Sequence, residues 1–331
     1  MKKVTLETIA QEVGVSKVAV YKALNGKGGV SEELKAKIQV IASNLGYTRT
    51  KKKFNDNMHF IYAIHKNFFL TSSEQFYTSI YYYLTCECEK INSNLRIVFL
   101  DDQQDNISVL KNIASSSKDK IDGIFIAGEI NRDLIEGLEG FNQPVVFIDF
   151  YSPLYNYSYI HTDNYYLSYM LTQHLIDRGH KKIGFVGNIE STSAIADRYY
   201  GFKKALSENK LDYQPSWHIN SNIEHLNDLT GVLPEMLPTA FVCHCDPAAH
   251  KMYAALNLRN LSIPNDVSII SFDNTKLCEN IIPTLTSAGC NKETIAKKSF
   301  SAMLEVLADK NKVINTILKP VFTVRNSVRD I

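Results

Sequence analysis

From residue 58 onward, short apolar runs alternate with longer segments in which apolar residues recur at helical spacing. The apolar runs predict strands near residues 60–64, 96–100, 122–126, 144–149, 182–187, 239–243 and 267–271. The longer segments predict helices near residues 75–92, 105–116, 164–178, 197–208, 247–258 and 291–308. Strands that alternate with helices build a parallel sheet with helices on both faces. We therefore expect an α/β fold, doubly wound, in two similar lobes.

The first 47 residues carry a different pattern, which predicts three short helices. Apolar residues recur at helical spacing over residues 4–13, and Thr5 is suited to cap the start of this helix. Gly14-Val15-Ser16 then connects it to a second helix near residues 17–24, and a third helix begins after Ser31. A connection of about three residues is the turn length of a helix-turn-helix.

Positive charge is concentrated in this N-terminal segment. The whole chain has a formal net charge of only +1, but residues 1–53 carry eleven Lys or Arg against four Glu. This segment is therefore +7 and the remaining 278 residues are −6. A basic helical module on a mildly acidic body is typical of a DNA-binding domain attached to a second domain.

The second helix has the size that fits the major groove of DNA. Its predicted outer face carries Lys17, Val18, Tyr21 and Lys22. Lysine can donate to guanine O6 and N7 or to phosphate, and valine can contact a thymine methyl group. A helical bundle that binds another protein is the alternative interpretation of this segment.

These N-terminal motifs resemble the headpiece of the lac repressor/galactose repressor family of transcriptional regulators. The resemblance rests on Val4–Ala10, Gly14-Val15-Ser16, Val20–Asn25, Val30-Ser31 and Leu45-Gly46-Tyr47. It implies that residues 17, 18 and 22 read bases. The family usually has Thr, Ser and Arg where this chain has Ala19, Tyr21 and Lys22. Lys22 replaces a bidentate donor with a point charge, which weakens base discrimination.

Residues 48–57 form a basic linker. The resemblance implies a hinge helix here that inserts an apolar wedge into the minor groove, and Phe54 is the only apolar candidate for that wedge. The usual sequence pattern of the hinge helix is missing, and Lys51, Lys52 and Lys53 can hold phosphates without any helix. A hinge helix and a flexible basic linker both stay open. The complete set of expected DNA contacts is Thr5, Ser16, Lys17, Val18, Tyr21, Lys22, Asn25, Lys51, Lys52, Lys53 and Phe54.

In doubly wound folds ligands bind at the carboxyl ends of the strands. Asp149, Asp246 and Asp273 each follow a predicted strand, and Arg198 lies on the helix after another. Carboxylates and an arginine suit a polyhydroxylated ligand because each can bind neighbouring hydroxyls in a bidentate way. For any one of these aspartates, a helix N-cap is an equally good interpretation, and Asp246 can be both cap and ligand.

The body extends the resemblance over nearly the whole chain and implies a domain like the periplasmic sugar-binding proteins. The matching segments are Pro144–Asp149, Arg198–Phe202, Pro238–Asp246, Ile263–Asp273 and Arg325-Asn326-Ser327. The family implies effector contacts from Arg198 and Asp273, with Asp149 and the position before Asp246 often involved. That position is Cys245, where the family often has Asn, and Ser271 replaces a usual Gly. The expected effector site is Phe76, Asp149, Arg198, Cys245, Asp246 and Asp273.

These inferences give a domain plan with residues 1–47 as headpiece, 48–57 as linker and 58–331 as an effector-binding and dimerisation domain. We expect lobe one at about 58–160 and 290–321, and lobe two at about 161–289 and 322–331. The expected partners are a pseudo-palindromic double-stranded DNA operator, a small sugar or sugar-like effector and a second copy of the chain, because a two-fold dimer places two recognition helices on one site. The tyrosine-rich helix near 75–92 is a candidate part of the dimer surface, and packing of this helix on both sides within one monomer is the alternative.

No apolar run is long enough for a membrane span and no signal sequence opens the chain, so we expect a cytoplasmic, nucleoid-associated protein. Its six cysteines are then expected to be reduced. The pairs Cys86/Cys88 and Cys243/Cys245 are spaced at i and i+2, which does not converge well on one metal, and no metal or cofactor is expected.

No catalytic motif stands out, so the chain is not expected to be an enzyme. The expected function is a transcriptional regulator, most simply a repressor of sugar-utilisation genes. The same kind of regulator with a purine or another metabolite as its effector is the alternative. A sugar-binding transport protein fits the body but not the headpiece.

Overall fold

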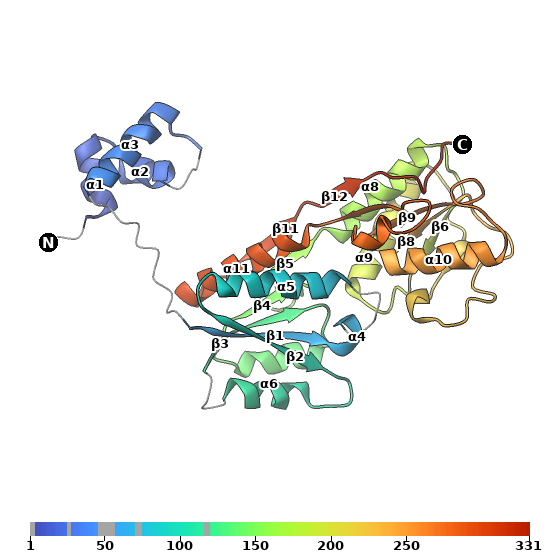
Figure 1. Ribbon diagram of the computed structural model, residues 1–331, viewed down its shortest axis with the longest axis horizontal. Coiled ribbons are helices and arrows are strands. Elements are labelled where there is room, and N and C mark those ends of the chain that lie inside the picture. The colour runs from blue at the N-terminus through green and yellow to red at the C-terminus, as the bar shows by residue number, and fades with distance from the viewer. Residues whose placement is uncertain (1–3, 25–27, 46–56, 70–74, 116–119) are drawn as a thin grey trace. The chain divides into compact units, whose positions relative to one another are not determined.

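The computed structural model describes residues 4–24, 28–45, 57–69, 75–115 and 120–331. The chain divides into two compact units, Met1–Asn55 and Asp56–Ile331. In the first unit, three helices surround a small apolar core (Figure 1). They are α1 (Leu6–Val13), α2 (Lys17–Leu24) and α3 (Glu32–Asn44).

Local hydrogen bonds fix the ends of these short helices. The Thr5 hydroxyl accepts from the backbone N–H of Thr8 at 3.3 Å, and the Ser16 hydroxyl accepts from that of Ala19 at 3.2 Å. Gly14 ends α1 with a φ of 76°, a conformation that glycine adopts without strain. Ile9, Val20 and Ala23 are then buried together, which confirms the expected helix-turn-helix packing.

The second unit contains two six-stranded sheets with equivalent strand orders. The first has the order β11-β5-β4-β3-β1-β2 and the second β12-β10-β9-β8-β6-β7. The first sheet comprises β1 (His59–His65), β2 (Asn94–Leu100), β3 (Ile121–Ala127), β4 (Val145–Ile148), β5 (Ser158–Thr162) and β11 (Asn315–Leu318). The second comprises β6 (Ile183–Val186), β7 (His218–Ile219), β8 (Ala240–Cys243), β9 (Ser268–Phe272), β10 (Thr286–Gly289) and β12 (Val321–Thr323). All neighbouring strands are parallel except β10 and β12, which pair antiparallel.

Each sheet has helices on both faces, as expected for a doubly wound fold. We call the first sheet with its helices lobe one, and the second sheet with its helices lobe two. In lobe one, α5 (Gln75–Glu89) and α11 (Lys292–Ala308) lie side by side over one face (Figure 1), whereas α6 (Asn106–Ala114) and α7 (Arg132–Gly137) pack on the other. In lobe two, α8 (Asn164–Asp177) and α9 (Ser193–Glu208) cover one face and α10 (Asp246–Leu258) covers the other. The short helix α4 (Lys66–Phe69) follows β1. Single-turn 3-10 helices complete the fold: η1 (Leu138–Gly140), η2 (Pro215–Trp217), η3 (Ile223–His225) and η4 (Lys276–Cys278).

All seven predicted strands and all six predicted helices of the body are present. The sequence pattern missed β5, β7, β10, β11 and β12, together with the short helices α4 and α7. Within the residues that the structure describes, no helix is both long and apolar enough to cross a bilayer.

The packing of α8 on α9 depends on one glycine. A Cβ atom at Gly201 would lie 2.1 Å from the backbone oxygen of Tyr165. Only glycine allows α9 to come this close to α8, and Arg198 lies one turn before it on the same helix. Gly201 therefore sets the depth at which Arg198 is buried.

Gly201→Ala should lower the free energy of unfolding by about 3 kcal/mol, because the added methyl group forces the two helices apart. The sign of this change is informative, because alanine stabilises an unobstructed helix by about 1 kcal/mol relative to glycine. Urea denaturation of the full chain measures the change. Gly140→Ala is the matched control, because its Cβ would meet only the Lys111 ammonium at 3.8 Å. An unchanged or raised stability of Gly201→Ala would contradict this account of the helix contact.

Candidate functional site

A cavity of about 530 Å³ lies between the two lobes, where the carboxyl ends of both sheets face each other. We call it the cleft. Lobe one contributes Phe68, Phe76, Tyr77 and Asp149 to its lining. Lobe two contributes Arg198, Glu224, His244, Cys245 and Asp273.

Asp149 and Asp273 occupy equivalent positions in the two sheets. Asp149 follows β4 with a φ of 58°, and Asp273 follows β9 with a φ of 93°. The backbone N–H of each donates across to the next strand at 2.8 Å, to Ile160 in one lobe and Ala288 in the other. The same left-handed turn therefore presents a carboxylate to the cleft from both sides.

The two carboxylates have different partners. Asp273 forms an ion pair with Arg198, with 3.3 Å between Oδ1 and Nη2. Asp149 accepts a hydrogen bond from the Tyr77 hydroxyl at 3.0 Å. Burial raises the pKa of Asp149 to about 6, although the positive charge of Arg198 opposes this shift. Asp149 is thus a carboxylate whose charge changes close to neutral pH.

Arg198 is 8% exposed and uses its guanidinium to connect three elements. Nε donates to Asn164 Oδ1 at 2.9 Å, and Nη1 donates to the backbone oxygen of His244. The guanidinium carbon also lies 4.7 Å from the centre of the Phe272 ring. Its position is therefore fixed before any ligand enters the cleft.

The two lobes also contact each other directly beside the cleft. Glu129, which follows β3, accepts hydrogen bonds from the Ser193 hydroxyl at 2.8 Å and from the Ser193 backbone N–H. Tyr151 of lobe one approaches Asp197 of lobe two at 3.5 Å. These contacts connect loops of lobe one to the first turns of α9.

Five of the six expected effector residues line the cleft: Phe76, Asp149, Arg198, Cys245 and Asp273. Asp246 does not. Its carboxylate is fully buried and accepts from Ser287 Oγ at 2.7 Å, from Thr275 N at 2.7 Å and from Ser271 Oγ. The prediction of Asp246 as a ligand contact is therefore corrected. The hydrogen bonds of this carboxylate connect α10 to β9 and β10. Nor is it the cap of α10, since Cys245 Sγ accepts the N–H of Ala248 at 3.4 Å.

Several polar residues of the cleft were missed by sequence reasoning. They are Glu129, Asn131, Asn222, Glu224 and His244, which lie in loops or in the single turn η3. For Glu129 and His244 a signal was available. Both follow the ends of predicted strands, β3 and β8, by one or two residues.

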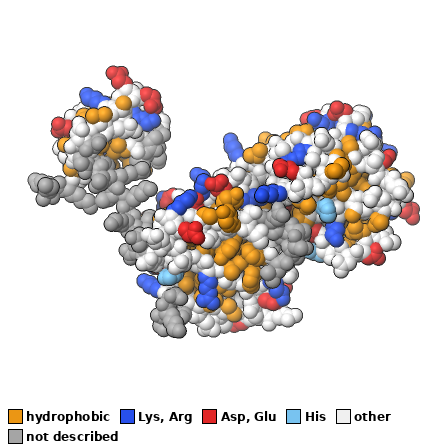
Figure 2. All heavy atoms as spheres, in the orientation of Figure 1, with side chains coloured by type: hydrophobic (Ala, Val, Ile, Leu, Met, Phe, Trp, Pro, Cys, Tyr) orange, Lys and Arg blue, Asp and Glu red, His pale blue; other side chains and the backbone are white. Residues whose placement is uncertain are grey.

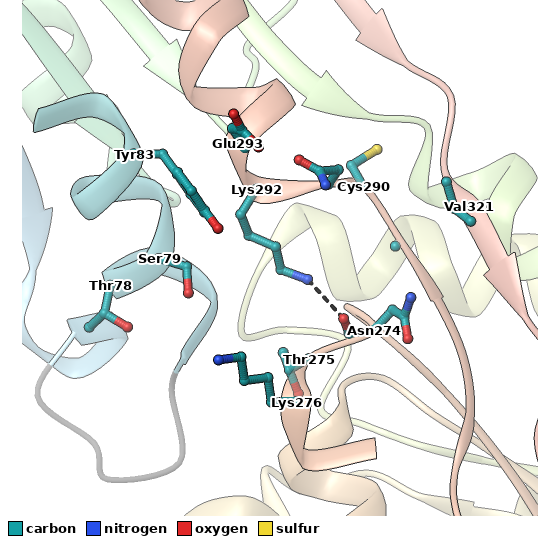
Figure 3. A pocket seen from close by; sticks show the side chains of 12 residues that line it. Thr78, Ser79, Tyr83, Asn274, Thr275, Lys276, Cys290, Lys292, Glu293 and Val321 are labelled. Atoms are coloured by element: carbon teal, nitrogen blue, oxygen red, sulfur yellow. Dashed lines mark hydrogen bonds between the residues drawn. The ribbon is translucent and has the colours of Figure 1, made fainter. Parts of the chain in front are cut away.

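A second cavity of about 550 Å³ is lined by Asn274, Thr275 and Lys276, which follow Asp273 in the sequence, and by Lys292 (Figure 3). Tyr83 of α5 and Lys276 of η4 face it from opposite sides. Lys292 donates to the backbone oxygens of Asp273 and, at 3.3 Å, of Asn274, and its ammonium lies 5.4 Å from the Phe76 ring centre. Lys292 of lobe one therefore supports the backbone of the turn that carries Asp273.

The headpiece presents its predicted recognition face to solvent. Val18 is 61% exposed and Tyr21 is 44% exposed on α2. Lys17 is exposed and paired with Glu7 of α1 at 3.1 Å, and Lys22 is half-buried. Thr5 and Ser16 are exposed and serve as helix caps. Asn25, Lys51, Lys52, Lys53 and Phe54 lie outside the described residues.

Comparison with known families matches both units. Residues 5–50 match the model of bacterial regulatory proteins of the lacI family. Residues 172–328 match the periplasmic binding protein-like domain.

Two curated relatives match along nearly their full length. The HTH-type transcriptional repressor PurR of Actinobacillus pleuropneumoniae serotype 3 (strain JL03) is 27% identical over 99% of both chains. The Ribose operon repressor of Haemophilus influenzae (strain ATCC 51907 / DSM 11121 / KW20 / Rd) is 26% identical over 98% of both.

Solved structures share the fold. The transcriptional regulator CelR in complex with cellobiose superposes with a TM-score of 0.71 at 19% identity, covering 98% of this chain and 99% of that one. The lac repressor dimer bound to operator and the anti-inducer ONPF gives a TM-score of 0.67 at 18% identity, covering 99% of this chain and 100% of that one. With a helix-turn-helix unit that matches the family model and a two-sheet body of the periplasmic-binding-protein type, the chain belongs to the lacI family of bacterial regulatory proteins.

Proposed function

We propose that this chain is a transcriptional repressor whose binding to operator DNA is controlled by a small sugar-like effector in the cleft. The observation that carries the effector assignment is the arrangement of Asp149 and Asp273, at the same turn of the two lobes, with Arg198 already fixed between its partners. Fixed carboxylates and a guanidinium bind neighbouring hydroxyl groups in a bidentate way. In this proposal, residues 1–47 are the headpiece, 48–57 the linker and 58–331 the effector and dimerisation domain.

A purine effector is the second candidate. Phe68 and Tyr77 lie 5.7 Å apart between ring centres and Phe76 and Tyr77 lie 5.0 Å apart, so the cleft has an aromatic wall that suits a flat ring. One curated relative is named as PurR and another as a ribose operon repressor. Asp149, Arg198 and Asp273 on the lining favour hydroxyls over a heterocycle, because a neutral ring edge does not match the carboxylates.

The working form in this proposal is a homodimer on a pseudo-palindromic site, because one small headpiece makes too few contacts for specific affinity. The dimer surface proposed is α5 with the adjacent α11. Ile80 and Leu84 are fully buried within the lobe, whereas Tyr82 is 63% exposed. Figure 2 shows apolar side chains gathered on the face that α5 and α11 present. A second copy of the chain would cover them.

Sugars that bind the cleft should raise the melting temperature of the full chain and change its operator affinity, whereas purines should do neither. Arg198→Ala should weaken the active sugar by about 10–100-fold, because a charged hydrogen-bonding group is lost. It should also abolish the effect of the sugar on DNA binding while leaving ligand-free operator affinity nearly unchanged.

Melting scans, calorimetry and gel shifts measure these effects. Lys203→Ala is the matched control, since Lys203 lies on the same helix over the Tyr213 ring and does not line the cleft. Wild-type sugar affinity in Arg198→Ala would overturn the pocket assignment. A response to purines alone would replace the sugar with the second candidate.

Effector affinity should fall as the pH is lowered through about 6, by up to about tenfold per pH unit. The pKa of Asp149 is raised by burial to about 6. Below that pH the carboxyl group is protonated and can no longer accept hydrogen bonds from neighbouring ligand hydroxyls at both oxygens. Asp149→Asn should bind more weakly at neutral pH and lack this step. Calorimetry across the pH range tests it, and an identical step in the variant would assign the titration to another group.

Lys22→Ala should weaken operator binding by about 1–3 kcal/mol and relax the preference at one base pair. Selection of binding sites from a random pool, followed by affinity measurement, tests both effects. Lys35→Ala is the control, because Lys35 lies on α3 and pairs with Glu32 at 3.2 Å. An unchanged sequence preference in Lys22→Ala would remove this residue from base readout.

A further inference from the structure

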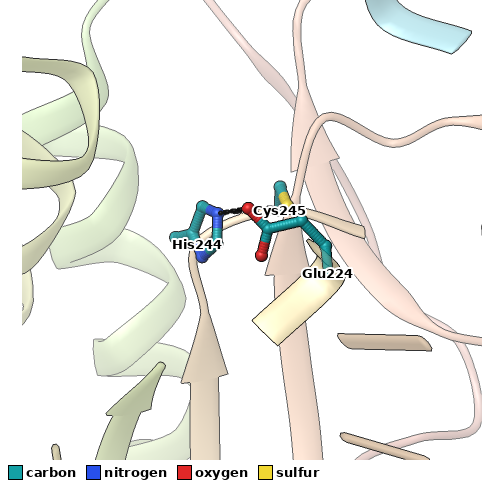
Figure 4. Close-up of side chains that lie close together, drawn as sticks. All are labelled: Glu224, His244 and Cys245. Carbon is teal, nitrogen blue, oxygen red and sulfur yellow. Dashed lines mark hydrogen bonds and ion pairs between the residues drawn. The ribbon is translucent and has the colours of Figure 1, made fainter. Parts of the chain in front are cut away.

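Three potential metal ligands converge on the lobe-two wall of the cleft (Figure 4). Glu224 comes from the turn η3, His244 follows β8, and Cys245 is the N-cap of α10. Glu224 Oε1 lies 3.3 Å from His244 Nε2, and Cys245 Sγ lies 3.3 Å from the same nitrogen. We infer that these three side chains bind one divalent transition-metal ion, with zinc as the best match.

The hydrogen bonds of His244 fix which nitrogen faces the group. Nδ1 lies 3.2 Å from the backbone oxygen of Val186, and a carbonyl can only accept, so Nδ1 carries the hydrogen. Nε2 of the neutral ring therefore points its lone pair at Glu224 and Cys245. Metal-binding histidines commonly donate their second ring N–H to a backbone carbonyl in this way. With a neutral ring, the imidazole nitrogen and the carboxylate oxygen are two facing acceptors, and a metal ion or a proton between them would satisfy both.

The separations from His244 Nε2 to the other two ligand atoms are close to the edges of a tetrahedral site. Zinc binds histidine nitrogen and carboxylate oxygen at about 2.0–2.2 Å and thiolate sulfur at about 2.3 Å. Tetrahedral angles then place nitrogen and oxygen about 3.3 Å apart and nitrogen and sulfur about 3.6 Å apart. The observed distances are both 3.3 Å, and all the ligand atoms lie within 4.8 Å of one another. A proton-bridged pair would prefer about 2.9 Å between nitrogen and oxygen.

The carboxylate is incompletely satisfied without a cation. The Glu224 side chain is 6% exposed, and among the described residues its Oε2 atom has no hydrogen-bond partner. An unpaired buried carboxylate oxygen is unfavourable, and a metal ion would neutralise it.

The sulfur is placed where negative charge is favoured. Cys245 Sγ accepts the N–H of Ala248 at 3.4 Å, at the start of the 13-residue helix α10. The positive end of the helix dipole stabilises a thiolate, the form in which cysteine binds metals. Glu224, His244 and Cys245 all line the cleft, so the fourth coordination position faces it. Water or an oxygen atom of a cleft ligand would occupy that position.

Cobalt(II) is the probe for this site, because a tetrahedral cobalt–thiolate centre absorbs strongly in the visible and near ultraviolet. The full chain, reduced and freed of metal with a chelator, should bind about one equivalent of cobalt and release it to about one equivalent of zinc. Cys245→Ser should lose the sulfur-to-cobalt band. Cys245→Ser, His244→Gln and Glu224→Gln should each weaken zinc binding by at least about tenfold.

Two controls match the ligand types. Cys86→Ser removes a half-buried thiol of lobe one, and His250→Gln removes an exposed histidine of α10. Both should keep the band and the affinity. X-ray absorption of the zinc-loaded wild-type chain should show one sulfur neighbour, and this readout needs no variant to fold. Absence of stoichiometric binding, a band that survives in Cys245→Ser, or a sulfur-free zinc shell would leave Glu224 and His244 as an ion pair only and overturn the proposal.

Discussion

Burying a guanidinium between two lobes is strongly unfavourable unless its N–H groups find partners, and this requirement organises the cleft. Arg198 meets this requirement by donating to the side-chain oxygen of Asn164 in α8, the backbone oxygen of His244 after β8 and the carboxylate of Asp273 after β9. Each partner must sit at the carboxyl end of its strand or the start of its helix for the network to close. The close crossing of α8 and α9 at Gly201 brings Asn164 within reach. The geometry of lobe two is thus tied to one side chain.

The repeated topology explains why a second carboxylate faces this arginine. Both sheets have the same strand order, and the turns after β4 and β9 have the same left-handed conformation. The repeat therefore generates a pair of opposed aspartates without any contact between them. What distinguishes them is the neighbourhood: Asp273 has the guanidinium, whereas Asp149 has only the Tyr77 hydroxyl as a hydrogen-bonding partner of its side chain among the described residues. Burial raises the pKa of Asp149 for that reason.

The sequence predicted the parts of the fold that have a strong period. Continuous apolar runs such as β4 and β8 are buried on both faces, and this is why they stand out. The pattern missed β5, whose buried and half-buried residues alternate through Tyr159 and His161, and β10, which reads Thr-Ser-Ala-Gly. Both strands are recognisable only from their pairing with neighbours.

The residues of the site also divide into those that a local sequence feature predicts and those whose role depends on partners far away along the chain. Asp149 and Asp273 were predictable because a strand end is a local feature. Asp246 also comes soon after a strand, three residues beyond β8. Its oxygens, however, accept hydrogen bonds from Ser271, Thr275 and Ser287, which lie 25 to 41 residues away along the chain. Glu224 reaches His244 from an isolated 3-10 turn, a convergence that no spacing rule contains. Side chains whose role depends on such distant partners require the folded structure.

A two-lobed sensor can respond to a ligand only if the ligand distinguishes between two arrangements of the lobes. The cleft meets this condition because its charged groups come from both lobes, so a ligand that contacts Asp149 and Arg198 together favours the arrangement in which they face each other. The direct contacts of Glu129 with Ser193 and of Tyr151 with Asp197 favour the same arrangement without a ligand. A ligand that bridges Asp149 and Arg198 adds charged hydrogen bonds to these direct contacts and therefore stabilises the same arrangement further.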